Sequence, residues 1–250
     1  MAKYLVTRFR PGQGFAHFFH LGFIALVPLF VWFFVRLDLV AVAFIVLLLS
    51  KWRMFAVHPR HWIAHIRSNA VDVIAGLSFI IFITQSSSVW TQALWVLLYE
   101  VWLLFLKSGS SVTLVALQAL VAQSLGVTSF FLAFEGADLA IYVLGFWLIT
   151  YFSARHFFAV FDELHGSLIA AIWAFFASSL MWVLGHWLIF FGPIAQPALL
   201  ITVLSFCLSG LYYLDKHNKL HATIKRQLIA MMMAIVFVIV VFSDWGDKAL

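Results

Sequence analysis

Long apolar runs alternate with short polar segments along the whole chain. Runs such as "GLSFIIFI" and "AMMMAIVFVIVVF" are continuously apolar, whereas the strands of a transmembrane β-barrel alternate apolar and polar residues. A helix needs about 20 apolar residues to cross a bilayer, and this criterion predicts nine membrane-spanning helices. The predicted spans are residues 15–35, from the Arg36-Leu37-Asp38 turn to 50, 70–84, 89–106, 112–134, 139–161, 167–191, 198–214 and 227–242.

Composition supports the same class. The chain has 250 residues, of which 65% are hydrophobic and 10% are charged, whereas soluble domains carry about 25% charged residues. We therefore predict an all-α polytopic integral membrane protein that forms one transmembrane domain over residues 1–250 in the cell (inner or plasma) membrane. The lipid bilayer is its predicted partner, nucleic acid is not, and association with membrane proteins or with further copies of the chain is left open.

The basic residues predict the orientation of the spans. If the N-terminus is cytoplasmic, only Arg36 and Lys248 fall outside. Because cytoplasmic loops are enriched in Lys and Arg, this distribution predicts that the N-terminus is inside and the C-terminus is outside. The residues assigned to the inside are Lys3, Arg8, Arg10, Lys51, Arg53, Arg60, Arg67, Lys107, Arg155, Lys216, Lys219, Lys225 and Arg226.

Two sequence patterns concern how the helices are organised. The segments "LLLSKWRMFAV" and "TYFSARHFFAV" share S-x4-FAV at an offset of 103 residues, which suggests repeats over about 15–107 and 112–214 followed by a final helix, 227–242. Chance is the alternative in a chain so rich in Phe, Ala and Val. Small residues four apart, at Gly166, Ala170, Ala174 and Ser178, predict a close helix–helix contact.

The stretch "HPRHWIAHIR" spaces His58, His61 and His65 three and four residues apart. Pro59 suits the first position of a helix, so we predict a short interfacial helix near 59–67, because His, Trp and Arg suit a membrane surface. The alternative is a metal site, since two histidines four apart on a helix point the same way. The candidate ligands are His61, His65, His217 and His221, with iron or zinc as the metal.

The segment "SARHFFAVFDELHG" gathers several ionisable groups at the predicted inner end of two spans. His156, Asp162 and Glu163 are the candidate catalytic residues, and Arg155 is a candidate for a substrate or ion pathway. The Arg155–Asp162 and His156–Glu163 pairs are seven residues apart, about 10 Å along a helix, which is too far for direct contact. If the span extends to 161, Arg155 and His156 lie within the hydrocarbon edge, where ionisable groups are usually functional.

Glu100 is the one acid well inside a predicted span, in "WVLLYEVWLLFLK". Such a carboxyl must be neutral or paired inside the bundle. Lys107, two turns later, is expected on the same helix face. Gln118, Gln123 and Asp72 are the candidate partners of the Glu100 carboxyl. Together with Glu100 and Arg155, they form the predicted substrate or ion pathway.

Three functional hypotheses remain open. The first is a permease-like or channel-like protein, or a membrane subunit, that handles a small or lipid-like solute. The second is a membrane-embedded enzyme with a cytoplasmic-side His, Arg and acidic site, which could depend on a metal. The third is a structural membrane partner without a site. The sequence contains no GxxxxGK[ST], CxxCH or GxSxG motif, so it offers no sign of an ATP-driven motor, a haem-attachment site or a serine hydrolase.

Overall fold

The structure is a computed structural model that describes residues 14–52, 58–107, 111–187 and 189–245. These residues form nine α-helices, with a 3₁₀ turn, a π-helical turn and one two-stranded hairpin. The α-helices are α2 (Gly14–Arg36), α3 (Val40–Ser50), α4 (Trp62–Gln85), α5 (Val89–Val101), α6 (Val112–Ala133), α7 (Leu139–Ala159), α8 (Gly166–Gly185), α9 (Gln196–Lys216) and α10 (Ala222–Phe242). The other elements are η2 (Pro59–His61), η3 (Trp102–Leu106), β1 (Phe190–Phe191) and β2 (Ile194–Ala195).

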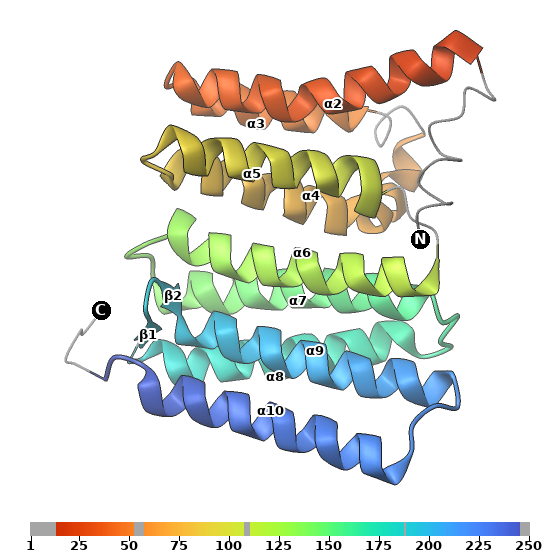
Figure 1. The fold of residues 1–250 in the computed structure, drawn as a ribbon, viewed down its shortest axis with the longest axis vertical. Helices are drawn as coiled ribbons and strands as arrows, with labels where there is room; N and C mark the ends of the chain where they lie inside the picture. The colour runs from red at the N-terminus through yellow and green to blue at the C-terminus, as the bar shows by residue number, and fades with distance from the viewer. Residues whose placement is uncertain (1–13, 53–57, 108–110, 188, 246–250) are drawn as a thin grey trace.

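The helices lie side by side in two layers, and successive helices run in opposite directions (Figure 1). One layer contains α2, α5, α6, α9 and α10, and the other contains α3, α4, α7 and α8. Within the described residues, six helices are long and apolar enough to cross a membrane: α4, α5 with η3, α6, α8, α9 and α10. The chain is therefore a multi-pass membrane protein by the length and composition of its helices.

The first predicted turn is present and very short. Helix α2 ends at Arg36, α3 begins at Val40, and Asp38 between them has a φ of 58°. Asp tolerates this left-handed conformation better than most residues because its short side chain can hydrogen-bond locally. Two apolar helices can thus reverse direction with almost no loop.

Two predicted boundaries are wrong. Residues 62–67 are not a separate interfacial helix, because they form the first turns of α4, which continues to Gln85. These turns are exposed on all sides, and burial begins only near Ala70. The seventh span does not reach 191, because α8 ends at Gly185 and the hairpin of β1 and β2 follows. Gly192 makes the turn at a φ of 58°, where a residue without Cβ is favoured.

The predicted small-residue contact is confirmed. Gly166, Ala170, Ala174 and Ser178 are all buried, and α8 packs along α7. Small side chains let two backbones approach closely, which stabilises helix pairs in lipid through van der Waals contact.

The core is divided between the two halves of the bundle. One cluster of buried apolar side chains belongs mainly to α2–α5, and a second belongs to α6–α9. The halves meet where α4 packs on α6, and there the hydroxyl of Ser129 donates to that of Ser78 over 2.9 Å. A Cβ on Gly126 would lie 2.6 Å from Ile74, so glycine is required for this close approach.

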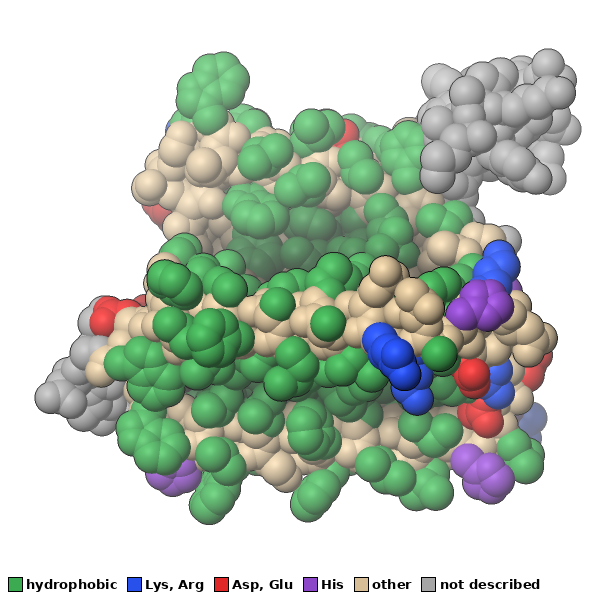
Figure 2. Space-filling view, turned by 60° about the horizontal axis from the view of Figure 1, so that its bottom comes forward, with side chains coloured by type: hydrophobic (Ala, Val, Ile, Leu, Met, Phe, Trp, Pro, Cys, Tyr) green, Lys and Arg blue, Asp and Glu red, His purple; other side chains and the backbone are tan. Residues whose placement is uncertain are grey.

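Charged side chains gather at one end of the bundle. In Figure 2 hydrophobic side chains cover most of the visible face, and most of the Lys, Arg, acidic and His side chains lie toward the end where α6 begins. Among the described residues, Arg36 is the basic residue at the opposite end. Lys3, Arg8, Arg10, Arg53 and Lys248, which also entered the orientation argument, lie outside the described residues.

Candidate functional site

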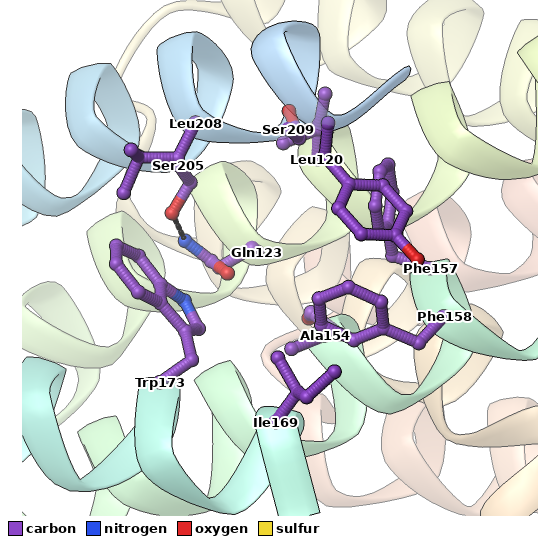
Figure 3. A pocket seen from close by; sticks show the side chains of 13 residues that line it. Leu120, Gln123, Ala154, Phe157, Phe158, Ile169, Trp173, Ser205, Leu208 and Ser209 are labelled. Atoms are coloured by element: carbon purple, nitrogen blue, oxygen red, sulfur yellow. Dashed lines mark hydrogen bonds between the residues drawn. The ribbon is translucent and has the colours of Figure 1, made fainter. Parts of the chain in front are cut away.

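A cavity of about 230 Å³ lies among α6, α7, α8 and α9. Its walls are mostly apolar, with Leu120 and Leu208 on one side and Ala154 and Ile169 on the other (Figure 3). The volume is just below the range of about 300–1,000 Å³ that is typical of pockets for drug-sized ligands. The space therefore suits a single alkyl chain or a small ring, and not a whole two-chain lipid.

Neutral polar side chains interrupt this apolar lining. The amide of Gln123 donates to the hydroxyl of Ser205, and the two side chains meet at the wall of the cavity with the Trp173 indole beside them (Figure 3). Ser153 also lines the cavity, and its hydroxyl is buried and has no hydrogen-bond partner among the described residues. A serine within a helix usually donates to a backbone carbonyl one turn earlier, so an unpartnered hydroxyl here is exceptional.

Three hydrogen-bond donors at this cavity are unused. The described residues offer no acceptor to the Ser153 hydroxyl or the Trp173 indole N–H, and the Ser205 hydroxyl accepts from Gln123 without donating in turn. Of these three, the Ser153 hydroxyl is the one that the described residues leave buried without a partner, and such a group costs free energy. A bound molecule with an acceptor oxygen would remove that cost.

Tyr212 connects the cavity to a charged group at the end of the bundle. Its ring lines the cavity, and its hydroxyl donates to Glu163. Glu163 also pairs with Lys216 at 2.7 Å. Hydrogen bonds from Lys216 and Tyr212 hold the pKa of the Glu163 carboxyl below its usual value. Glu163 lies in the turn between α7 and α8, directly after Asp162, which has a φ of 50°.

A second polar cluster is buried in the other half of the bundle. Asp72 in α4 pairs with Lys51 and, at 2.6 Å, with Lys107, and both ammonium groups contact the same carboxylate oxygen, Oδ2. Its other oxygen, Oδ1, accepts a hydrogen bond of 3.1 Å from the indole N–H of Trp102. The Lys51 side chain is 5% exposed and that of Asp72 is 10% exposed, whereas that of Lys107 is 37% exposed.

The π-helical turn η3 explains why Lys107 contacts Asp72. In a regular α-helix, residues seven apart share a face, which placed Lys107 beside Glu100. A π turn closes i→i+5 hydrogen bonds, and here the Lys107 N–H donates to the Trp102 carbonyl over 2.8 Å. The wider turn rotates the helix end, so that both Lys107 and Trp102 reach Asp72. Lys107, which was expected on the same helix face as Glu100, therefore pairs with Asp72.

The proposed partners of Glu100 are engaged elsewhere. The Oε1 of Gln118 lies 3.1 Å from the Nε2 of His156, and the Nε2 of Gln118 donates to the Leu106 carbonyl. Asp72 belongs to the lysine cluster and Gln123 to the cavity. Glu100 itself is half-buried on α5, with no ion pair or hydrogen bond among the described residues.

The candidate catalytic residues do not form one group. His156 faces Gln118 on α6, whereas Glu163 faces Lys216 on α9. Asp162 is exposed, and Arg155 is half-buried in α7 without an ion pair among the described residues. The arrangement brings together one predicted residue, Glu163, with two that were not predicted, Tyr212 and Lys216.

The candidate metal ligands occupy two segments, the start of α4 and the turn between α9 and α10. His61 and His65 are exposed around the start of α4, and the Arg60 Nε donates to the Nε2 of His61 over 2.9 Å. His217 stacks on Tyr213, and His221 precedes α10. No cluster of three or more His, Cys, Asp or Glu side chains that could hold a metal ion occurs in the described part of the chain.

Several residues of these sites were missed from sequence. Ser153 stood inside the suspected repeat motif, but only as a matching letter, and Trp173 and Ser205 lie in unbroken apolar runs. Lys51 served only as a topology signal. A serine or tryptophan in a span is ordinary, so no sequence signal separates a ligand-facing one from a packing one.

No protein-family model, curated protein or solved structure matches this chain. The function is therefore inferred from the geometry of the cavity and of the two polar clusters.

Proposed function

We propose that this chain is a permease-like membrane protein whose cavity among α6–α9 accepts a neutral, lipid-like solute. The observation that carries the proposal is the unpartnered, buried hydroxyl of Ser153 at the wall of an otherwise apolar cavity. Apolar walls favour an alkyl chain or ring, and the unused donors favour a carbonyl, ester or ether oxygen on it.

The charge of the cavity indicates the kind of solute. Among the described residues, no Lys, Arg, Asp or Glu side chain lines it. A charged ligand would lose its hydration without a counter-charge, which is costly in a low-dielectric site. A neutral molecule with one acceptor group loses little on entry and gains hydrogen bonds from Ser153, Ser205 and Trp173.

The orientation and repeat predictions complete the proposal. The loops that were assigned to the cytoplasm from their basic residues lie at one end of the antiparallel bundle, which supports nine spans with the N-terminus inside and the C-terminus outside. Helices α2–α5 and α6–α9 take the same places in the two layers, which supports two repeats followed by α10. A C-terminal reporter that is active in the cytoplasm would contradict this orientation.

The binding proposal is tested by extracting and identifying lipids from the purified protein by mass spectrometry. Ala154→Phe places a large side chain in the cavity, and we expect it to remove most of a co-purifying neutral lipid. Ala93→Phe on the exposed side of α5 is the matched control and should retain it. A second variant, Ser153→Ala/Trp173→Phe, keeps the apolar walls but removes two donors, and should lower retention without affecting folding.

Equal lipid content in the wild type and both cavity variants would contradict the proposal. A neutral lipid that is depleted only in the cavity variants would support it and would identify the solute class. Transport would then be tested with that lipid in reconstituted vesicles.

A further inference from the structure

The lysine–aspartate cluster of the first half contains an uncompensated positive charge. Lys51 and Lys107 both bind Oδ2 of Asp72, so two cations share one carboxylate. The second oxygen, Oδ1, is taken by the neutral indole of Trp102. Two ammonium groups and one carboxylate sum to one excess positive charge in a site where two of the three groups are nearly inaccessible.

Buried excess charge is unfavourable unless a counter-charge compensates it. Glu100 on α5 contacts neither lysine, and exposed Arg60 and Arg67 lie at the same end of the bundle and add positive charge. Among the described residues, no second carboxylate reaches the cluster. An anion from solution or from the membrane would supply a compensating negative charge.

The geometry leaves room for an anion at Lys107. Each ammonium group has three N–H donors, and Asp72 is the one acceptor that the described residues give to either lysine. Lys51 is buried, but the Lys107 side chain is 37% exposed. The free donors of Lys107 are therefore the accessible part of the cluster.

We infer that Lys107, held by Asp72 and flanked by Lys51, binds a phosphate group at the ends of α3 and η3, beside the first half of α4. Lysine is a common phosphate ligand that acts as a point charge. The cluster lies at the end of apolar helices, where lipid headgroups are found, and basic sites between helix ends commonly bind anionic headgroups there. The phosphate could belong to a lipid headgroup or to a free ion. This site is separate from the α6–α9 cavity and does not depend on the function proposed for it.

The test measures thermal unfolding of the full-length protein in a neutral detergent. Dioleoylphosphatidylglycerol is compared with dioleoylglycerol, which lacks the phosphate, and sodium phosphate is compared with sodium chloride at equal ionic strength. We expect the phosphate-bearing probe to raise the midpoint of the wild type. Lys107→Gln should weaken apparent binding by about tenfold or more, because one charge-assisted contact is lost.

The variants separate binding from folding. Lys107→Gln leaves Lys51 and Asp72 as a neutral pair, so the protein should still fold. Lys107→Arg should restore most of the phosphate effect, and Lys219→Gln, an exposed lysine at the same bundle end, should keep it. A shift with the lipid alone assigns the site to a headgroup, and a shift with both probes assigns it to phosphate in general. No shift with either probe, or an unchanged shift in Lys107→Gln, would overturn the inference.

Discussion

The two halves of the bundle bury polar groups in opposite ways. In α3–η3 the buried groups are charged and directly paired, with Asp72 at the centre of three partners. In α6–α9 the buried groups at the cavity are neutral and partly unpaired, and the ion pair of Glu163 with Lys216 lies at the bundle end. Two lysines that share one carboxylate stabilise the fold, and their excess positive charge attracts an anion. Unused hydrogen-bond donors in an apolar space favour a neutral ligand instead.

The largest effect is expected from the charged half. Asp72→Asn removes the carboxylate that Lys51 and Lys107 share and leaves two cations facing each other. Breaking a buried ion pair from one side costs about 3–5 kcal/mol. We expect a strong loss of thermal stability in detergent and of folded yield by size-exclusion chromatography.

Two further variants isolate the charge effect. Asp162→Asn is a matched change at an exposed residue whose left-handed backbone Asn also tolerates, and it should behave like the wild type. Asp72→Asn/Lys51→Met removes one of the two cations and should recover part of the stability. If Asp72→Asn alone is as stable as the wild type, the cluster does not hold the first half together.

A smaller effect is expected from packing beside the same cluster. A Cβ on Gly76 would lie 2.6 Å from Leu47 Cδ1 and 3.1 Å from the hydroxyl of Tyr99, which is buried without a partner among the described residues. Overpacking of this kind costs about 1–3 kcal/mol, so Gly76→Ala should lower the unfolding midpoint. Gly210→Ala in α9 meets no atom within 4 Å and should be neutral or stabilising. Similar midpoints in the two variants would show that the first half is loosely packed there.

Two serine-to-alanine substitutions should change the free energy of unfolding differently. Ser129→Ala removes a hydroxyl that donates to Ser78 and to the Gly126 carbonyl, and should cost about 1 kcal/mol. Ser153→Ala removes an unpartnered hydroxyl, so in lipid-stripped protein it should be neutral or slightly stabilising. Both are measured as free energies of unfolding in mixed detergent micelles. An equal loss for Ser153→Ala would mean that this hydroxyl is paired in the protein.

The smallest effect is the pH dependence of the exposed ion pair. The pKa of Glu163 in the folded protein lies below its unfolded value. Its stabilisation is therefore present above the unfolded pKa and is lost as the pH falls through the folded pKa. The unfolding midpoint of the wild type should fall more steeply with acid than that of Glu163→Gln. Parallel curves would show that Lys216 and Tyr212 do not stabilise the carboxylate.

The helices were largely predictable because apolar length is a strong signal in membrane proteins. The small-residue contact of α8 followed from its period of four. The boundary errors arose where the signal is compositional: "HPRHWIAHIR" is polar enough to suggest a separate element, yet α4 runs through it. The stretch after Gly185 is apolar enough to continue a helix, yet Gly192 and the hairpin end it.

The sites were less predictable because they depend on which helix faces which. Asp72, Gln118 and Gln123 were selected as important polar residues. Each of them forms a hydrogen bond or an ion pair with a residue of a neighbouring helix or helix end. The placement of Lys107 on the same helix face as Glu100 assumed a regular helix beyond Trp102, and the π turn breaks that register. A cavity cannot be read from periodicity at all, since it is the space that four helices leave between them.

The most direct test of the central claim is a cryo-electron microscopy map of the protein purified in mild detergent and bound to an antibody fragment. The account predicts non-protein density among α6–α9, elongated along the apolar walls, with one end within hydrogen-bond distance of Ser153 and Trp173. A cavity filled by rearranged side chains, with the Ser153 hydroxyl bonded to its own helix, would contradict the account.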